Sequence, residues 1–257
     1  MKIILFSDVH ANLPALEAFF ADAETHQADA IYCLGDLVGY NIWPNEVIAE
    51  IRRRRIPTIA GNYDFGIGRH SHECGCAYKT DEERANGAVS ISLTNELVTK
   101  NSRAYLRTLP AHIQLDFHLN DDTLRLLLVH GSPRRINEYL FEDRPEKSLL
   151  RIIEQADADV LCFGHTHQPF HRVLNSGDDA APHFRHAINI GSVGKPKDRD
   201  NRGTYAILEF DASTSTLDKD SLTVTFVKFD YDIETAARAV EDSRLPNAYA
   251  ENLRNGY

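Results

Sequence analysis

Short apolar runs alternate with amphipathic segments through the first part of the chain. The runs at 2–6, 30–34 and 57–60 predict three strands. Between them, apolar residues recur at helical spacing, which predicts a helix that starts after Asn12 and a second helix over 44–54. Asn12 is a favourable helix cap, and Pro14 is harmless in a first turn because its missing N–H has no partner there. This alternation predicts a parallel sheet with right-handed crossovers.

A loop is expected over 65–79, and after it the segment from Thr80 to Glu83 has the pattern of a capping box. It predicts a helix, followed by a shorter one near 103–109. The side chains expected on the inward side of the first of these helices are Ala85, Ala88, Val89 and Leu93.

Apolar and polar residues alternate over 113–119, which predicts a strand there. A turn at 120–122 and a returning strand over 124–129 are expected to follow. A helix over 145–155 and a strand over 160–163 follow. The remaining pattern predicts strands at 170–174, 183–190, 204–210 and 222–229 and a last helix at 233–243.

Composition narrows the class of protein. Of the 257 residues, 42% are hydrophobic and 26% are charged, which is typical of globular domains, and no linker-like segment divides the chain, so we expect one domain over 1–257. The first residues do not resemble a signal peptide, and no apolar run reaches membrane-spanning length, which predicts a cytoplasmic protein without a membrane partner. The net charge of -10 argues against an extended nucleic-acid surface but is compatible with a small phosphorylated substrate.

The four cysteines do not form a disulfide framework. Cys33 and Cys162 lie inside apolar runs and are expected to be buried. Cys74 and Cys76 lie one residue apart, which allows a metal-binding or redox pair, although a structural role is the simpler interpretation.

Candidate chemistry is concentrated where strands end. Gly164-His165-Thr166-His167 follows the apolar run at 160–163, and Gly164 lets the chain turn so that both imidazoles project beyond the sheet edge. A pair of histidines alone is equally compatible with an ordinary polar loop that binds no metal. Four other predicted strands, however, also end in potential ligands. The complete set is Asp8, His10, Asp36, Asn62, His130, His165 and His167.

These carboxylate, amide and imidazole groups suit divalent ions such as Mn, Fe, Zn or Ni. Seven ligand-type residues exceed the needs of one tetrahedral site, so two metal ions are the economical interpretation. Asp36 lies between two groups of ligands and is well placed to bridge the two ions. The alternative is that each residue caps a helix or forms a turn, which becomes improbable for five strand ends together.

The same residues resemble the calcineurin-like metallophosphoesterases. The family pattern is D-x-H, G-D-x-x-G, G-N-H-D/E, a single His and G-H-x-H. It matches, in order, Asp8-Val9-His10, Gly35-Asp36-Leu37-Val38-Gly39, Gly61-Asn62-Tyr63-Asp64, His130 and Gly164-His165-Thr166-His167. Asn189-Ile190-Gly191-Ser192 is similar to a further N-P-G-S stretch.

The resemblance implies an α/β fold, a four-layer α-β-β-α sandwich of two mixed sheets flanked by helices. It also implies how the ligands are shared: one ion would be held by Asp8, His10, Asp36 and His167, and the other by Asp36, Asn62, His130 and His165. Asn62, Tyr63, Asp64 and His130 would form the catalytic centre.

One position departs from the family pattern, because Tyr63 replaces the usual histidine. A tyrosine can donate a hydrogen bond, but it cannot carry a positive charge at neutral pH. Three interpretations are open: Tyr63 binds the phosphate as a neutral donor, His70 or His72 supplies an imidazole, or the site is slow. Arg134 and Arg135 are further candidates for phosphate binding, with a solvated surface turn as the alternative. The cationic residues after Gly194, a possible substrate rim, are Lys195, Lys197, Arg199 and Arg202.

The predicted function is hydrolysis of a phosphate ester, by in-line attack of a hydroxide held between two metal ions. A phosphodiester is favoured over a phosphomonoester. The alternatives are a phosphoprotein phosphatase and a non-catalytic metal-binding scaffold of the same fold.

Overall fold

The computed structural model of the protein describes residues 1–120, 122–178 and 180–257, and their strands form two mixed sheets. The four-stranded sheet has the order β2-β1-β8-β9, in which β1 and β2 are parallel. The five-stranded sheet has the order β3-β4-β5-β7-β6, in which β4, β5 and β7 are parallel. The strands are β1 (Lys2–Phe6), β2 (Ala30–Cys33), β3 (His112–His118), β4 (Thr123–Val129), β5 (Val160–Phe163), β6 (Phe170–Asn175), β7 (Phe184–Asn189), β8 (Gly203–Glu209) and β9 (Thr223–Phe229).

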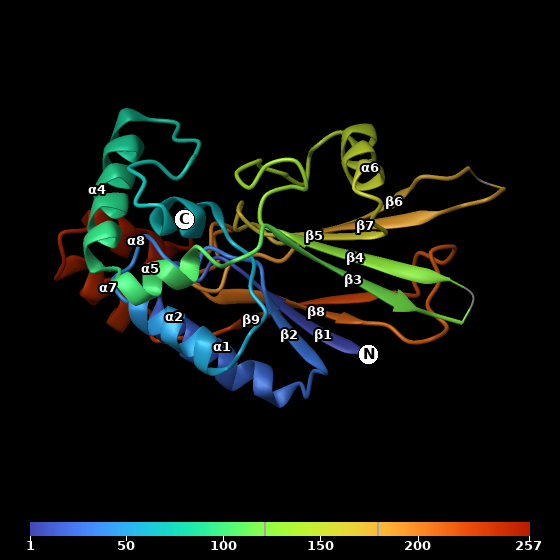
Figure 1. The fold of residues 1–257 in the computed structure, drawn as a ribbon, viewed down its shortest axis with the longest axis horizontal. Coiled ribbons are helices and arrows are strands. Elements are labelled where there is room, and N and C mark those ends of the chain that lie inside the picture. Colours follow the sequence, from blue (N-terminus) through green and yellow to red (C-terminus); the bar gives the residue numbers. More distant parts are fainter. Residues whose placement is uncertain (121, 179) are drawn as a thin grey trace.

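The helices cover the outer faces of the two sheets. Figure 1 shows α6 above the five-stranded sheet and α1 on the far side of the four-stranded sheet. The predicted four-layer arrangement is therefore confirmed. The helices are α1 (Leu13–Thr25), α2 (Pro44–Arg53), α3 (Asn62–Gly68), α4 (Asp81–Leu97), α5 (Lys100–Leu106), α6 (Glu146–Gln155), α7 (Ile233–Glu241) and α8 (Asn247–Asn255).

The alternation of side chains along β1 explains the layers. Ile3 and Leu5 are buried between the two sheets, whereas Ile4 and Phe6 pack on the opposite face against α1. Both faces of the strand are buried, which is why its sequence is apolar throughout.

The predicted helix starts are confirmed at α1 and α4. The Asn12 side chain accepts a hydrogen bond from the Ala15 amide, and Thr80 and Glu83 form the capping box. The hairpin of β3 and β4 also follows the prediction, although Asp121 in its turn lies outside the described residues.

Two predicted segments differ from the structure. The predicted strand at 57–60 is reduced to a single bridge between Thr58 and Cys33, and it makes no longer ladder among the described residues. The predicted loop at 65–79 is wrong at its start, because α3 runs through Gly68. This helix is short and contains two glycines, so intrinsic propensity gave no signal for it.

The inward face of α4 agrees only in part with the one expected, since Leu93 is buried as predicted. Ala85, Ala88 and Val89 are exposed, and Gly87, Ser90 and Ile91 face inward instead. The Ser90 hydroxyl accepts a hydrogen bond from the Tyr40 amide, a partner that hydrophobic periodicity does not reveal.

The helix expected to be the last one is α7, but α8 follows it. Both carry the apolar side chains that close the core on the four-stranded sheet. No helix in the described ranges has the length and apolar character needed to cross a membrane.

Candidate metal centre

The turns after β1, β2, β4 and β5, with the first residue of α3, bring all seven predicted ligand-type residues together. Parallel strands end at one edge of a sheet, and the two sheets place these edges side by side. Every one of the seven is almost completely buried, with at most 4% of its surface exposed. A group of this size, buried together, needs a compensating charge.

The first triad consists of Asp8, His10 and His167. Asp8 Oδ1 lies 3.1 Å from His167 Nε2, and the Nε2 atoms of His10 and His167 are 3.2 Å apart. One ligand atom from each of the three residues lies within 4.8 Å of the others, so a single ion can contact all three.

The second triad consists of Asp36, His130 and His165, and it satisfies the same 4.8 Å limit. Asn62 joins it, since its Oδ1 lies 3.1 Å from His130 Nε2. Asp36 Oδ2 is 3.4 Å from His130 Nε2 and 3.6 Å from His10 Nε2, and it therefore lies between the two triads.

Backbone carbonyls fix the orientation of three of the imidazoles. The Nδ1 atoms of His10, His130 and His167 donate to backbone oxygens at 3.0, 2.8 and 2.5 Å, respectively. A carbonyl oxygen can only accept, so each Nδ1 carries a proton and each Nε2 faces the cluster. When the ring is neutral, its Nε2 presents a lone pair there. This arrangement is how proteins orient histidines that bind metals.

Several acceptors consequently face one another without a donor between them. The two lone pairs of His10 and His167 are one case. The Asn62 oxygen also points into the cluster, because its Nδ2 donates to the Cys74 carbonyl at 2.8 Å. Asp8 Oδ1 has no donor within the part of the chain that the structure describes. Facing acceptors repel unless a cation lies between them, so this donor set fits divalent metal ions.

The pKa values of the cluster diverge. Burial lowers the pKa of both His165 and His167 to about 3, so both stay neutral and able to bind a metal. Burial would also lower the pKa of His130, but the charge of Asp36 raises it to about 10. Burial alone would raise the pKa of Asp8, but the neighbouring histidines hold it well below its ordinary value.

The ligand loops have an unusual backbone. The φ angles of Asp8, His10, Asp36, His165 and His167 lie between 49° and 66°, in the left-handed region. Non-glycine residues pay about 1 to 2 kcal/mol each for this conformation. Hydrogen bonds hold it in place, for example from the Asp8 amide to the Gly35 carbonyl and from the His10 amide to the Asp36 carbonyl, both at 2.9 Å. Strain of this kind is typical of functional sites.

Two glycines give the carboxylates room. A Cβ atom on Gly164 would lie 2.4 Å from Asp8 Oδ2, and one on Gly61 would lie 2.0 Å from Asp36 Oδ1. Any side chain at either position would therefore displace a carboxylate of the cluster.

Asp64, predicted to be part of the catalytic centre, hydrogen-bonds to two backbone amides. It accepts from Gly61 at 3.0 Å and from Leu37 at 2.9 Å. Burial, and then the charge of Asp36, raises its pKa to about 7. These bonds join the loop after β2 to the start of α3, so Asp64 positions both.

Tyr63 is buried, with 1% of its surface exposed. Its amide donates to Asp36 Oδ1 at 2.8 Å, and its ring lies 5.5 Å from the ring of His10. The hydroxyl is buried and has no partner among the described residues. His70 and His72, the alternative source of an imidazole, are both exposed.

The predicted phosphate-binding arginines lie near His130. Both line a hollow of about 310 Å³ to which His130 also contributes. Both arginines are exposed, and Arg134 forms an ion pair with Glu138, with Nε 3.1 Å from Oε2. Cys74 is buried, and Cys76 Sγ lies 3.6 Å from Asn62 Nδ2.

Sequence reasoning missed two neighbours of the centre. The ring centroids of Tyr139 and His165 are 4.1 Å apart, and no sequence pattern indicated that Tyr139 lies there. Asn189 donates to the Gly164 carbonyl at 2.8 Å and to Thr166 Oγ1 at 2.9 Å, and it thus holds the loop that carries His165 and His167. Its N-I-G-S context was visible in the sequence, but these contacts were not.

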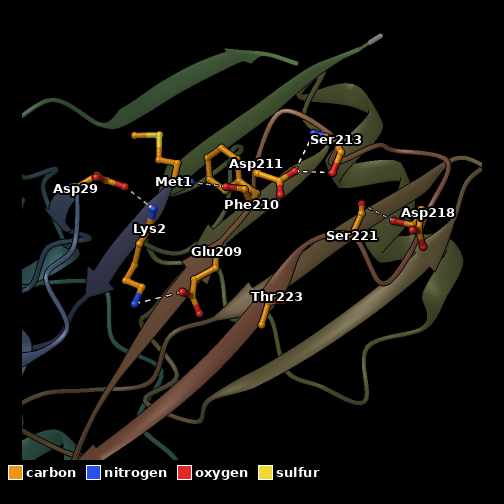
Figure 2. A pocket seen from close by; sticks show the side chains of 10 residues that line it. All are labelled: Met1, Lys2, Asp29, Glu209, Phe210, Asp211, Ser213, Asp218, Ser221 and Thr223. Atoms are coloured by element: carbon orange, nitrogen blue, oxygen red, sulfur yellow. Dashed lines mark hydrogen bonds and ion pairs between the residues drawn. The ribbon is translucent and has the colours of Figure 1, made fainter. Parts of the chain in front are cut away.

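A larger hollow, of about 560 Å³, lies beside the amino end of β1 (Figure 2). Its polar groups already pair with one another: Lys2 Nζ lies 3.2 Å from Glu209 Oε1, and the Lys2 amide donates to Asp29. None of the seven ligand-type residues, all of which the structure describes, lines this hollow. Its chemistry does not match that of the triads.

A family model of the calcineurin-like phosphoesterase superfamily domain matches residues 1–213. The chain belongs to the calcineurin-like phosphoesterase superfamily. It is therefore a member of a hydrolase family that uses divalent metals, and its two triads are candidate metal-binding groups.

Three relatives illustrate its place in the superfamily. An uncharacterized protein of Methanocaldococcus jannaschii is 30% identical over 261 residues, which cover 98% of this chain and 96% of the relative. The crystal structure of a metallophosphoesterase from Sphaerobacter thermophilus is 28% identical, with a TM-score of 0.72 and coverage of 100% and 99%. A UDP-2,3-diacylglucosamine hydrolase of Blochmanniella pennsylvanica is 27% identical, over 68% of this chain and 83% of the relative.

Proposed function

We propose that the protein is a dinuclear metal-dependent phosphoesterase that prefers phosphodiesters to phosphomonoesters. The observation that carries this proposal is the position of Asp36 Oδ2 between two sets of facing acceptors. Asp36 would bridge the ions. The first ion would also be held by Asp8, His10 and His167, and the second by Asn62, His130 and His165.

When bound, the two ions lower the pKa of water to about 7 and so supply the nucleophile for in-line displacement at phosphorus. The chain contributes the surroundings. Burial of the ligands excludes bulk water, which strengthens electrostatic interactions with the developing charge. The Cys74 carbonyl fixes the amide of Asn62, which orients the substrate as well as binding metal.

The substrate-binding roles of Tyr63, Arg134 and Arg135 stay predictions. Arg135 is exposed beside the hollow that includes His130, and its nearness to this one residue is what supports a contact with the substrate. The other six ligand-type residues, all of which the structure describes, do not line that hollow. Arg134 would have to exchange Glu138 for a phosphate, so we expect it to contribute less.

The relatives named UDP-2,3-diacylglucosamine hydrolase support hydrolysis as the reaction class. We propose a small phosphate ester as the substrate and do not extend their substrate to this chain. A cytoplasmic location stays a prediction from the sequence.

The test combines elemental analysis with two chromogenic esters, bis(p-nitrophenyl) phosphate and p-nitrophenyl phosphate. We expect two ions per chain, turnover that chelation abolishes and Mn²⁺ restores, and faster cleavage of the diester. Saturating Mn²⁺ should also stabilise the fold, by about 2.7 kcal/mol at a hundred times the dissociation constant. Two bound ions without turnover on either ester would favour the metal-binding scaffold instead.

A further inference from the structure

Two aromatic rings connect the second triad with the protein surface. The ring centroid of Tyr139 lies 4.1 Å from that of His165 on one side and 5.8 Å from that of Phe141 on the other. The planes of Tyr139 and Phe141 are inclined by only 15°, so these two rings stack. Tyr139 is partly buried, whereas Phe141 has 44% of its surface exposed. The row of rings therefore begins at a residue of the metal centre and ends in solvent.

Leu140, between the two aromatic residues in the sequence, anchors this part of the chain. Its side chain is buried, with 1% of its surface exposed, in the core that α6 forms with the five-stranded sheet. Tyr139 and Phe141 do not belong to that core and stack on each other instead. An isolated exposed phenylalanine needs no functional explanation, but a stacked pair that reaches a ring of the metal centre forms a continuous surface.

Hydrogen bonds hold the segment that carries these rings on both sides. The Tyr139 hydroxyl accepts from the Ala77 amide at 3.3 Å, which fixes the inner ring. Just after the outer ring, the Glu142 carbonyl accepts from Arg172 Nη1 at 3.0 Å. Both rings are thus in position before a ligand arrives, which reduces the entropy that binding would cost.

A rigid aromatic surface beside a phosphoryl-binding centre complements a ligand that is both anionic and planar, because aromatic side chains bind planar rings by stacking. We propose that Tyr139 and Phe141 form an aromatic shelf, which binds a planar aromatic ring of the substrate while its phosphoryl group occupies the metal centre. The substrate class is then a phosphate ester with an aromatic ring on one of its ester groups. This inference rests on the proposed function, because it requires the phosphoryl group at the two ions.

The first experiment measures binding apart from turnover. Phenylphosphonate and methylphosphonate contain no ester bond, so a phosphoesterase cannot hydrolyse them. The full-length protein, loaded with Mn²⁺, is titrated calorimetrically with each. We expect the parent to bind phenylphosphonate about tenfold more tightly than methylphosphonate. Phe141→Leu keeps an apolar side chain but removes the ring, so the ratio should fall to about twofold or less. The matched control Phe141→Tyr keeps the ring and should keep the ratio.

The second experiment separates stacking from structural damage. In Phe141→Leu, the KM for bis(p-nitrophenyl) phosphate should rise about tenfold while kcat and metal content match the parent, and Phe141→Tyr should restore the KM. A fall in kcat or in bound metal at unchanged KM would assign Phe141 a structural role and would overturn the proposal.

The phosphonate titrations can also overturn the aromatic shelf by themselves. Equal affinity of the parent for the two phosphonates would do so, as would a parent that binds neither. An unchanged ratio in Phe141→Leu would be equally decisive. A parent that prefers phenylphosphonate but cleaves no ester would refute the proposed function alone, since the shelf would then still bind its ring.

Discussion

The two ends of β5 carry buried polar clusters that satisfy their side chains in opposite ways. At the amino end, Asp159 accepts from the Arg125 amide at 2.9 Å, and its other oxygen lies 3.3 Å from His183 Nε2 and 3.4 Å from Arg185 Nη1. At the carboxyl end, Asp8 Oδ1 has no donor among the described residues. The Asp159 carboxylate is therefore satisfied within the fold, whereas Asp8 keeps one oxygen available to a cation.

The largest expected difference between the clusters comes from removing one carboxylate in each. Asp36→Ala removes an oxygen that lies between both triads, so we expect loss of both metal ions and a fall in turnover of roughly 10³-fold, about 4 kcal/mol. Asp159→Ala should keep metal and turnover but lower the free energy of unfolding by about 3 to 5 kcal/mol, because it leaves buried donors unpaired. Elemental analysis, ester hydrolysis and urea unfolding measure these effects. Full turnover with two ions in Asp36→Ala would refute the bridging role.

The second prediction concerns pH and His186, whose amide donates to the Asp159 carbonyl at 2.8 Å beside the amino end of β5. Burial, and then the charge of His171, lowers the pKa of His186 to about 4, whereas the unfolded value is ~6.5. Between these values the unfolded chain binds a proton that the folded chain does not. The contribution of His186 is therefore present above pH ~6.5 and is lost as the pH falls toward about 4, by up to about 3 kcal/mol. Urea unfolding of the parent and of His186→Gln over this range should show a steeper loss in the parent. If the stability of the parent and of His186→Gln fell in parallel with pH, His186 would not be the source of the pH dependence.

The smallest effect is expected from a pair of asparagines, each of which organises a loop beside one cluster. Asn189 holds the loop of His165 and His167, so Asn189→Ala should lower turnover about tenfold by misplacing both ligands. Asn175 accepts from the Gly177 and His183 amides near the other cluster. Asn175→Ala should leave turnover intact and reduce stability by about 1 kcal/mol. If both variants lost turnover equally, the loop contacts of Asn189 would not explain its effect.

Much of the fold was predictable from residue patterns. The strands around the centre and the hairpin of β3 and β4 follow simple periodicity, and α1 begins at its asparagine cap. The short helix α3 was not predictable, because its first turn is fixed by distant contacts, such as the bond from the Tyr63 amide to Asp36. The inward face of α4 was missed for the same reason: Gly87 faces inward because Tyr78 occupies the space of its missing side chain.

The residues of the candidate site also fall into two groups, those that the sequence predicts and those that only the structure reveals. All seven ligand-type residues could be named from the sequence, because each follows a strand whose end the apolar pattern marks. Their pairing into two triads came from family resemblance, and the distances agree with it. The role of Asp64 as a link between two loops depends on backbone amides far away in the sequence.

The left-handed backbone of the ligand loops has a practical consequence for protein engineering. Glycine adopts this conformation without the penalty that aspartate and histidine pay, and asparagine tolerates it better than most residues. A library of the metal-free protein screened for heat resistance alone would therefore enrich glycine or asparagine at Asp8, His10 and His167. Variants selected in this way would be more stable but inactive, so directed evolution of this chain requires a screen that measures turnover in every round.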